Sequence, residues 1–310
     1  MSSAYQPAHP ARSEFVRVRG LNYHLLHWGE ARLASAARPP LVMVHGWMDV
    51  GASFQFVVDA LHTIEGSDRW IVAPDWRGYG RSESPNADCY WFPDYLGDLD
   101  AVLDHVCPGA PVDLLGHSLG GSVVMHYAGA RPGRIRRLIN LEGFGMPAFA
   151  ADEAPRRMAK WLDELKEPQA LRAYDSLDGV SSRLMKTNPR LAEDKARWLA
   201  SHWSAPQTDA DGQTRWHILG DPAHKRVNPV LQREEEVLAT HRRITAPLLF
   251  VQADHNELDT WWRGRLTLTD VHRRLDAVPQ VQRAQIAHAG HMLHHDQPEA
   301  LAALLAEFLA

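Results

Sequence analysis

The amino-acid sequence predicts an α/β fold, a mostly parallel, doubly wound sheet with a helical segment inserted after the sixth strand. Two observations carry this prediction. Short apolar runs alternate with longer amphipathic stretches, which is typical of parallel strands that are buried on both faces between helices. The alternation stops between residues 145 and 244 and then resumes. One sheet domain with a large insertion is therefore expected.

The N-terminal part is predicted from its polarity. Residues 1–13 are polar and contain proline, so a flexible N-terminus is expected there. Residues 15–19 and 23–28 alternate in polarity around Gly20, as the two strands of a hairpin do. Residues 31–40 are rich in Ala, Arg and Pro, which is typical of an exposed loop.

Four apolar runs then predict core strands. They are residues 41–45, 70–73, 112–116 and 138–141. Residues 94–106 place leucine and valine on one helical stripe, and residues 118–131 follow the third run as another helix. Strands that alternate with helices form βαβ units. Residues 14–144 are therefore predicted to be the first part of an α/β core.

The segment 145–244 is predicted to be a helical cap. Its helix-like stretches are residues 156–165, 191–201 and 229–240. Its tryptophans are Trp161, Trp198, Trp203 and Trp216. Residues 245–310 then complete the core, with strands at 247–253 and 281–287 and a final helix at 301–309. Because ligands of open α/β sheets bind beyond the carboxyl ends of the strands, the cap is expected to cover that edge.

The composition indicates a soluble globular protein, with 45% hydrophobic and 23% charged residues. A net charge of −5 gives no sign of a nucleic-acid partner. No run approaches the roughly 20 apolar residues of a membrane helix, and residues 1–13 lack the apolar segment of a secretory signal. Cys89 and Cys107 are too few for a disulfide framework or a zinc site. A cytoplasmic protein that binds a small molecule, with no membrane partner, is expected, and no feature specifies an oligomeric state.

The strongest chemical signal is G-H-S-L-G at residues 116–120, which follows a predicted strand and opens a predicted helix. This is the context of a nucleophile elbow, in which a serine occupies a strained strand-to-helix turn. Small neighbours let the backbone pass closely, and the helix N-terminus favours negative charge that develops at the serine oxygen. Ser118 is therefore the predicted nucleophile.

Three further motifs accompany the elbow. They are H-G-W at residues 45–47, D-W-R-G-Y-G-R-S at 75–82, and G-H at 290–291 followed by Q-P at 297–298. With these four motifs in this order, the chain resembles the α/β-hydrolase superfamily over nearly everything except the insert. The pattern is similar to serine hydrolases and esterases with a helical cap, including the eukaryotic serine hydrolase-like proteins.

The resemblance implies roles for three further residues. His291 is the predicted base, because a hydroxyl is a poor nucleophile until an imidazole accepts its proton. The backbone N–H groups of Trp47 and Leu119 are the predicted oxyanion hole. His291 and His295 are spaced as metal ligands can be, but no carboxylate motif accompanies them, so no metal and no cofactor are expected. The other histidines of this region are predicted to be solvated or hydrogen-bonded bystanders: His288, His294 and His295.

The third member of the triad has two candidates. The commonest position in the superfamily is the loop after the 247–253 strand, but Ala253 replaces the usual glycine there and Asn256 the usual aspartate. Some members, including many haloalkane dehalogenases, place a glutamate at the end of the preceding core strand. Glu142 occupies that position, and a carboxylate that ends an apolar strand needs a partner. Glu142 is the preferred acid and Asp254 the alternative.

Four other residues have structural interpretations. Asp75 and Arg77 are predicted to stabilise their own loop by hydrogen bonds and turn chemistry. Asp221 and His224 lie in the insert and form either a contact between the cap and the pocket or an ordinary turn. The second interpretation is preferred, because a loop that contains Pro and Asp needs no ligand to explain it.

The predicted reaction is hydrolysis of a small to medium, hydrophobic ester. Ser118 attacks the carbonyl with help from His291, an acyl-enzyme forms, and His291 then activates water. Because residue 118 is serine, dehalogenases and epoxide hydrolases that use an aspartate there are excluded. Carbon–carbon bond hydrolysis and cofactor-free perhydrolysis use the same triad and stay open. A non-catalytic binding protein on the same scaffold is the alternative from another class, although such proteins often lose the serine or the histidine.

Overall fold

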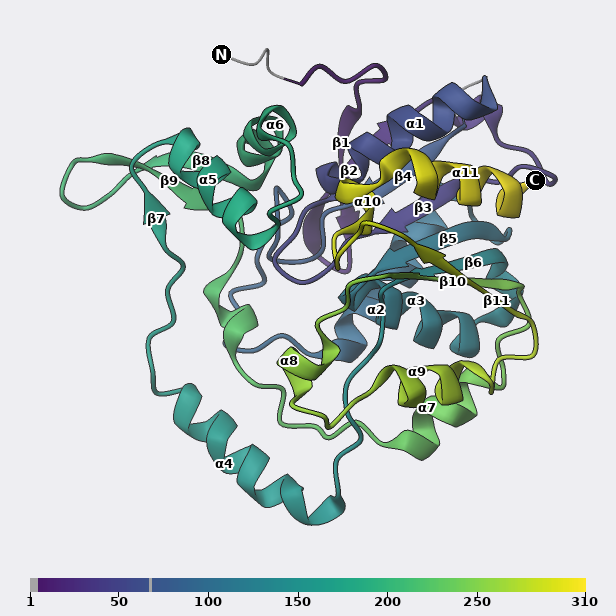
Figure 1. Cartoon of the computed structure of the whole chain (residues 1–310). Coiled ribbons are helices and arrows are strands. Elements are labelled where there is room, and N and C mark those ends of the chain that lie inside the picture. The colour runs from purple at the N-terminus through teal and green to yellow at the C-terminus, as the bar shows by residue number, and fades with distance from the viewer. Residues whose placement is uncertain (1–4, 67–68) are drawn as a thin grey trace.

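The computed structural model describes residues 5–66 and 69–310, and an eight-stranded sheet forms its centre (Figure 1). The strand order is β1-β2-β4-β3-β5-β6-β10-β11. The strands are β1 (Arg12–Val18), β2 (Leu21–Trp28), β3 (Leu41–Val44), β4 (Ile71–Pro74), β5 (Val112–His117), β6 (Ile135–Leu141), β10 (Leu248–Ala253) and β11 (Val281–Ile286). β2 pairs antiparallel with β1 and β4, and all other neighbours pair in parallel. The predicted mostly parallel sheet is confirmed, and the insert follows its sixth strand.

Helices cover both faces of the sheet (Figure 1). One face carries α1 (Gln55–Glu65), α10 (Leu293–Asp296) and α11 (Pro298–Leu309), which pack on one another. The other face carries α2 (Phe92–Val106), α3 (Leu119–Ala130), α7 (Glu234–His241) and α9 (Leu268–Leu275). This is the doubly wound arrangement that alternating strands and helices produce.

Strand β3 shows why the core strands are apolar throughout. Successive side chains of a strand point to opposite faces of the sheet. Val42 and Val44 accordingly join the apolar cluster that includes α2 and α3, and Leu41 and Met43 join the cluster that includes α1 and α11. All four side chains are fully buried. A strand between two helical layers has no solvent face, so polar residues do not alternate along it.

The insert differs from the predicted helical segment because it also contains a sheet. Its elements before α7 are α4 (Ala154–Glu164), β7 (Ala173–Tyr174), α5 (Leu177–Thr187), α6 (Glu193–Trp203), β8 (Ser204–Thr208) and β9 (Thr214–Ile218). The three strands pair antiparallel in the order β7-β9-β8. They were not predicted because they are short, half-buried or exposed at nearly every position, and mixed in polarity. The turn between β8 and β9 contains Asp211 and Gly212, and this pair is a hairpin signal that the polarity of the strands masked.

Two residues of the insert, Asp221 and His224, contact the sheet domain. The His224 ring stacks between the rings of Tyr79 and Tyr90, with centroid distances of 3.8 and 3.5 Å. The Asp221 carboxylate accepts a hydrogen bond from the Tyr90 hydroxyl at 2.9 Å and another from the N–H of Ala223 at 2.9 Å. These contacts bind the insert to the core beside the sheet.

Residues 5–13, which were predicted to be a flexible N-terminus, make specific contacts with the core. The four residues before it lie outside the described part of the chain. The ring of Tyr5 packs edge-on against Phe56 at 4.9 Å, and the Tyr5 hydroxyl donates to Asp59. Strand β1 then begins at Arg12. The prediction rested on polarity alone, and it missed an aromatic anchor and the carboxylate on α1 that binds it.

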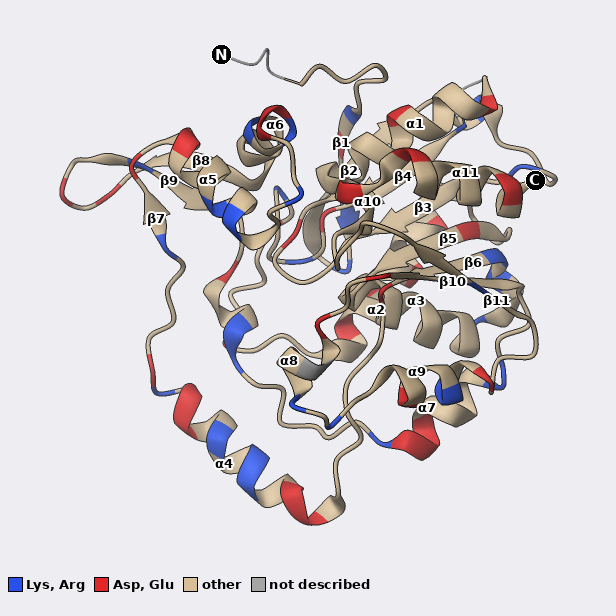
Figure 2. Ribbon diagram, viewed as in Figure 1, with Lys and Arg blue, Asp and Glu red and all other residues tan. Residues whose placement is uncertain are grey.

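Charged residues of both signs are interspersed over the surface elements (Figure 2). Helix α4 is an example, because its basic residues Arg156, Arg157 and Lys160 precede two acidic ones, Asp163 and Glu164. Neither sign dominates this helix. Among the described residues, no helix has both the length and the apolar content needed to span a bilayer.

Candidate active site

Ser118 lies in the turn between β5 and α3, beyond the carboxyl end of its strand. Its backbone has φ 53° and ψ −114°, a strained conformation for a residue with a side chain. The Ser118 N–H donates to the carbonyl of Leu141, at the end of β6, at 2.9 Å. The serine is therefore held at the edge of the sheet, where the N-terminus of α3 favours developing negative charge.

Close backbone packing explains the glycines of this turn. A Cβ atom on Gly120 would lie 2.3 Å from the carbonyl oxygen of Val44, and one on Gly116 would lie 2.3 Å from the Gly120 oxygen. A Cβ atom on Gly133, in contrast, would have no neighbouring heavy atom within 4 Å. An added methyl group therefore displaces the backbone of β3 or α3 at the elbow, but it meets open space at residue 133.

We expect Gly120→Ala to lower the free energy of unfolding by about 1–3 kcal/mol, the usual cost of overpacking. The control Gly133→Ala is expected to change it by less than about 0.5 kcal/mol. Urea denaturation of both variants measures the difference. Equal effects of the two substitutions would contradict close packing at the elbow.

His291 reaches the serine from the loop between β11 and α10. Its Nε2 atom lies 2.9 Å from Oγ of Ser118, which is hydrogen-bonding distance. The side chain is 19% exposed, and burial lowers the pKa of His291 to about 4. The imidazole is therefore neutral at pH 7, and Nε2 can accept the hydroxyl proton.

Glu142 follows β6 and approaches the other nitrogen of the same imidazole. Its Oε2 lies 3.3 Å from Nδ1 of His291, and its Oε1 accepts a hydrogen bond from the N–H of Ala253 at 2.7 Å. Burial raises the pKa of Glu142, whereas a positive charge on His291 favours its carboxylate form. The structure thus brings Ser118, His291 and Glu142 into one hydrogen-bonded chain.

Asp254, the alternative acid, has different partners. Its carboxylate accepts hydrogen bonds from His255 Nδ1 at 2.9 Å, from the N–H of His288 at 2.8 Å and from the N–H of Ala289 at 3.0 Å. These bonds hold the pKa of Asp254 well below its usual range. No hydrogen bond joins Asp254 to His291 within the described residues. Asp254 instead organises the loop that carries His291.

The two predicted oxyanion donors belong to segments that border the serine. Leu119 is the first residue of α3, so its N–H has no carbonyl partner within the helix. On the other side, a Cβ atom on Gly46 would lie 3.1 Å from Cβ of Ser118, so the H-G-W loop packs against the nucleophile. Trp47 is the next residue of that loop. Both backbone segments therefore border Ser118.

Aromatic residues lie near the hydrogen-bonded residues Ser118, His291 and Glu142. Two of these aromatic residues were not singled out from the sequence. Trp261, in α8 (Leu258–Trp262), packs edge-on against His291 at a centroid distance of 4.6 Å and is 40% exposed. Phe144 lies 6.5 Å from the same ring. Trp47 is 53% exposed. The adjacent tryptophans at 261–262 stand in an otherwise polar stretch. This pair was the sequence signal that could have identified the aromatic contact with His291.

The loop with Asp75 and Arg77 is held by buried hydrogen bonds. Asp75 accepts from the N–H of Gly51 at 2.7 Å and from the N–H of Arg81 at 2.9 Å. Arg77 pairs with the fully buried Asp98, with 2.6 Å between Nη2 and Oδ1. These contacts orient loops around the carboxyl end of the sheet.

Two of the three neighbouring histidines are buried; His295 is hydrogen-bonded, as the prediction of solvated or hydrogen-bonded bystanders allowed, whereas His294 has no hydrogen-bond partner among the described residues. His294 and His295 are 0% and 4% exposed, because α10 turns both side chains into the protein. His295 Nε2 lies 2.6 Å from Oγ of Ser53. His288 is exposed, as solvation requires. His295 therefore contacts Ser53, whereas His291 contacts Ser118.

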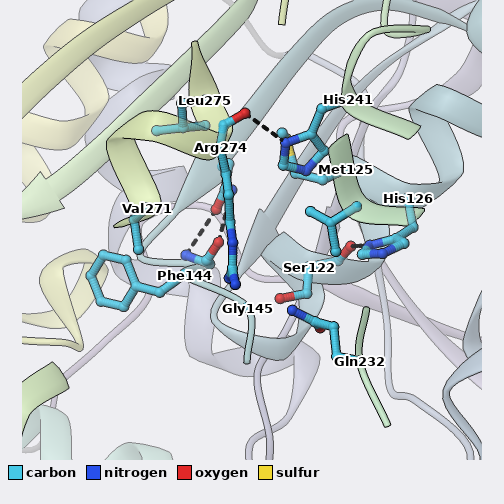
Figure 3. A pocket seen from close by; sticks show the side chains of 13 residues that line it. Ser122, Met125, His126, Phe144, Gly145, Gln232, His241, Val271, Arg274 and Leu275 are labelled. Carbon is cyan, nitrogen blue, oxygen red and sulfur yellow. Dashed lines mark hydrogen bonds between the residues drawn. The ribbon is translucent and has the colours of Figure 1, made fainter. Parts of the chain in front are cut away.

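A small cavity lies beside the segment that follows Glu142 (Figure 3). Ser122 and His126 of α3 contribute to its wall, and so does Arg274 of α9, which donates from Nη1 to the carbonyl of Met146 at 2.8 Å. None of the three residues of the hydrogen-bonded chain, all of which the structure describes, lines it. The cavity therefore adjoins the candidate active site through Phe144 without including the three hydrogen-bonded residues.

Comparisons with known proteins identify the family of the chain. The family model described as alpha/beta hydrolase fold matches residues 39–298. A probable serine hydrolase of Drosophila melanogaster is 30% identical over 261 residues, which cover 73% of this chain and 76% of that protein. Lipase LipV of Mycobacterium tuberculosis is 36% identical over 123 residues, 40% of this chain and 42% of the lipase. The solved thioesterase domain from the curacin biosynthetic pathway superposes with a TM-score of 0.76 at 24% identity, covering 95% of this chain and 99% of that domain.

The extent of these matches differs. The chain spans about half the length of the first curated relatives it matches, 52% and 53%. The likeness to the thioesterase domain concerns the fold. The family match, in contrast, includes the elbow, the whole insert and the histidine loop. The chain therefore belongs to the α/β-hydrolase fold family.

Proposed function

We propose that this hydrolase cleaves small to medium, hydrophobic esters through an acyl-enzyme on Ser118. The observation that carries the proposal is the chain of contacts from Ser118 through His291 to Glu142, at 2.9 and 3.3 Å. In this scheme Oγ attacks the ester carbonyl while Nε2 of His291 takes its proton. Glu142 holds the imidazole in the required tautomer and stabilises the imidazolium that forms.

The remaining steps use the same groups. The negative charge on the carbonyl oxygen is stabilised by the N–H groups of Trp47 and Leu119. The tetrahedral intermediate collapses, and the alcohol leaves with the proton from His291. Water, deprotonated by His291, then attacks the acyl carbon, and the acid is released from Ser118. No cofactor takes part in these steps.

The substrate class is proposed from the aromatic surroundings. Trp47, Phe144 and Trp261 favour an apolar acyl or alcohol group, since aromatic side chains offer large apolar contact areas. The Trp47 indole also donates to the carbonyl of His224 at 3.2 Å, which supports a role of the insert as a cap over the site. Similarity to a lipase and to a thioesterase domain supports acyl transfer over carbon–carbon hydrolysis or perhydrolysis.

The test is labelling of the purified chain with a fluorophosphonate, with the adduct located by mass spectrometry. Turnover of p-nitrophenyl esters of increasing acyl length is measured in parallel. We expect an adduct on Ser118 and turnover that is higher for apolar acyl chains than for acetate. Labelling of Ser118 without turnover of any ester would contradict ester hydrolysis and favour carbon–carbon bond hydrolysis or perhydrolysis. A folded protein without an adduct would instead favour a binding function.

A further inference from the structure

A second group of polar side chains lies behind the elbow. It consists of Asp49 in the loop after β3, His117 at the end of β5 and His294 in α10, which are 6%, 1% and 0% exposed. One ligand atom from each residue lies within 4.8 Å of the other two. Oδ2 of Asp49 and Nε2 of His294 are 4.0 Å apart. The proposed ester hydrolysis gives these three side chains no role.

The converging atoms have no hydrogen-bond partners. Within the described residues this holds for Oδ2 of Asp49, Nδ1 of His117 and both ring nitrogens of His294. Each unsatisfied buried polar atom costs about 1–3 kcal/mol, and native proteins contain only a few of them. Buried atoms of this kind are normally satisfied by a bound group or by ordered water.

The tautomer of His117 suits metal binding. Its Nε2 atom lies 2.8 Å from the backbone carbonyl oxygen of His291, and a carbonyl only accepts hydrogen bonds. Nε2 therefore carries the proton, and Nδ1 presents a lone pair to Asp49 and His294. Metal-binding histidines are typically oriented in this way, with the second ring N–H donated to a carbonyl or carboxylate.

We propose that Asp49, His117 and His294 bind one divalent transition-metal ion, for which zinc is the expected choice. Two imidazoles and a carboxylate are common zinc ligands, and a water molecule would complete a tetrahedral site. With bonds of about 2.1 Å, tetrahedral ligand atoms are roughly 3.4 Å apart. The widest pair must therefore approach by no more than about 1.4 Å, which side-chain rotation can provide. The ion would also compensate the buried Asp49 carboxylate, which has no Lys or Arg partner among the described residues.

The position of the group assigns the ion a structural role. Asp49 lies two residues after Trp47, His117 directly precedes Ser118, and His294 lies three residues after His291. One ion would therefore join the oxyanion loop, the nucleophile elbow and the histidine loop. It would take no part in the proton transfers, so the proposal does not depend on ester hydrolysis.

Metal content tests the proposal directly. The whole chain is stripped with a chelator, dialysed against zinc chloride, passed through gel filtration and measured by plasma mass spectrometry. We expect one equivalent of zinc in the wild type and roughly 100-fold or more weaker binding in Asp49→Asn and His294→Gln. His255→Gln, which removes an exposed imidazole beside Asp254, is the matched control and is expected to keep one equivalent. Zinc should also raise the melting temperature of the wild type and of the control.

A crystal of the zinc-treated wild type gives a test that does not depend on the folding of variants. Anomalous scattering at the zinc edge is expected to give a peak between Asp49, His117 and His294. A wild type that leaves gel filtration without zinc overturns the proposal, and buried water then satisfies these atoms. Variants at Asp49 and His294 that bind as tightly as the wild type, or a peak at another position, overturn it as well.

Discussion

Ser118→Ala is expected to lower kcat/KM for p-nitrophenyl esters by about 10⁵-fold or more, because it removes the only atom to which the acyl group is transferred. The remaining rate comes from substrate binding and oxyanion stabilisation, which do not depend on the hydroxyl. Loss of the fluorophosphonate adduct is expected in parallel. Stopped assays at high enzyme concentration, with repeated purification to exclude contaminating esterases, measure the residual activity.

Ser122→Ala is the matched control for this prediction. Ser122 lies one turn further along α3, its N–H donates to the carbonyl of Ser118 at 3.1 Å, and its side chain lines the neighbouring cavity of Figure 3. The same atom is removed from the same helix, but at a position that does not face His291. We expect kcat/KM to stay within about threefold of the wild type. A variant at Ser118 that retains the activity of the Ser122 variant would contradict the acyl-enzyme proposal.

The core of the fold could be predicted because its signals are local and unambiguous. Strands with no solvent face, such as β3, produce continuous apolar runs, and the elbow is a single strand–turn–helix unit around Ser118. The sheet β7-β9-β8 could not be predicted in the same way. Its strands are mostly half-exposed and polar, and β8 even contains Pro206, so neither alternation nor an apolar run marks them.

The contacts between the site residues could be identified only from the tertiary structure. The bond between His291 and Glu142 spans 149 positions in sequence, and only the glutamate's place at the end of a strand indicated it. The partners of Asp254 could not be predicted, because they are backbone N–H groups of a loop that follows another strand. The convergence of Asp49, His117 and His294 was likewise invisible, since each residue belongs to a different loop or helix end.

Glu142→Gln is expected to lower kcat by about 10³–10⁴-fold with little change in KM, while the protein stays folded. The glutamine carbonyl can still accept the N–H of Ala253, which holds the carboxylate at 2.7 Å in the wild type. Its amide group then faces Nδ1 of His291 as a donor. This selects the tautomer that carries the proton on Nε2, which cannot accept the proton of Ser118, and it removes the charge that stabilises the imidazolium.

Asp254→Asn distinguishes support of the imidazole from organisation of the loop. It replaces the carboxylate of the other candidate acid by a carboxamide, as Glu142→Gln does. The Asp254 carboxylate accepts hydrogen bonds from the N–H groups of His288 and Ala289. Within the described residues it makes no hydrogen bond with the imidazole of His291. We therefore expect less than about tenfold loss of kcat, together with faster hydrogen exchange at those two amides. Steady-state kinetics of both variants with one ester decides between the acids. If Asp254→Asn lost activity by orders of magnitude and Glu142→Gln did not, the carboxylate that serves His291 would be Asp254, and the buried Glu142 would only support the end of β6.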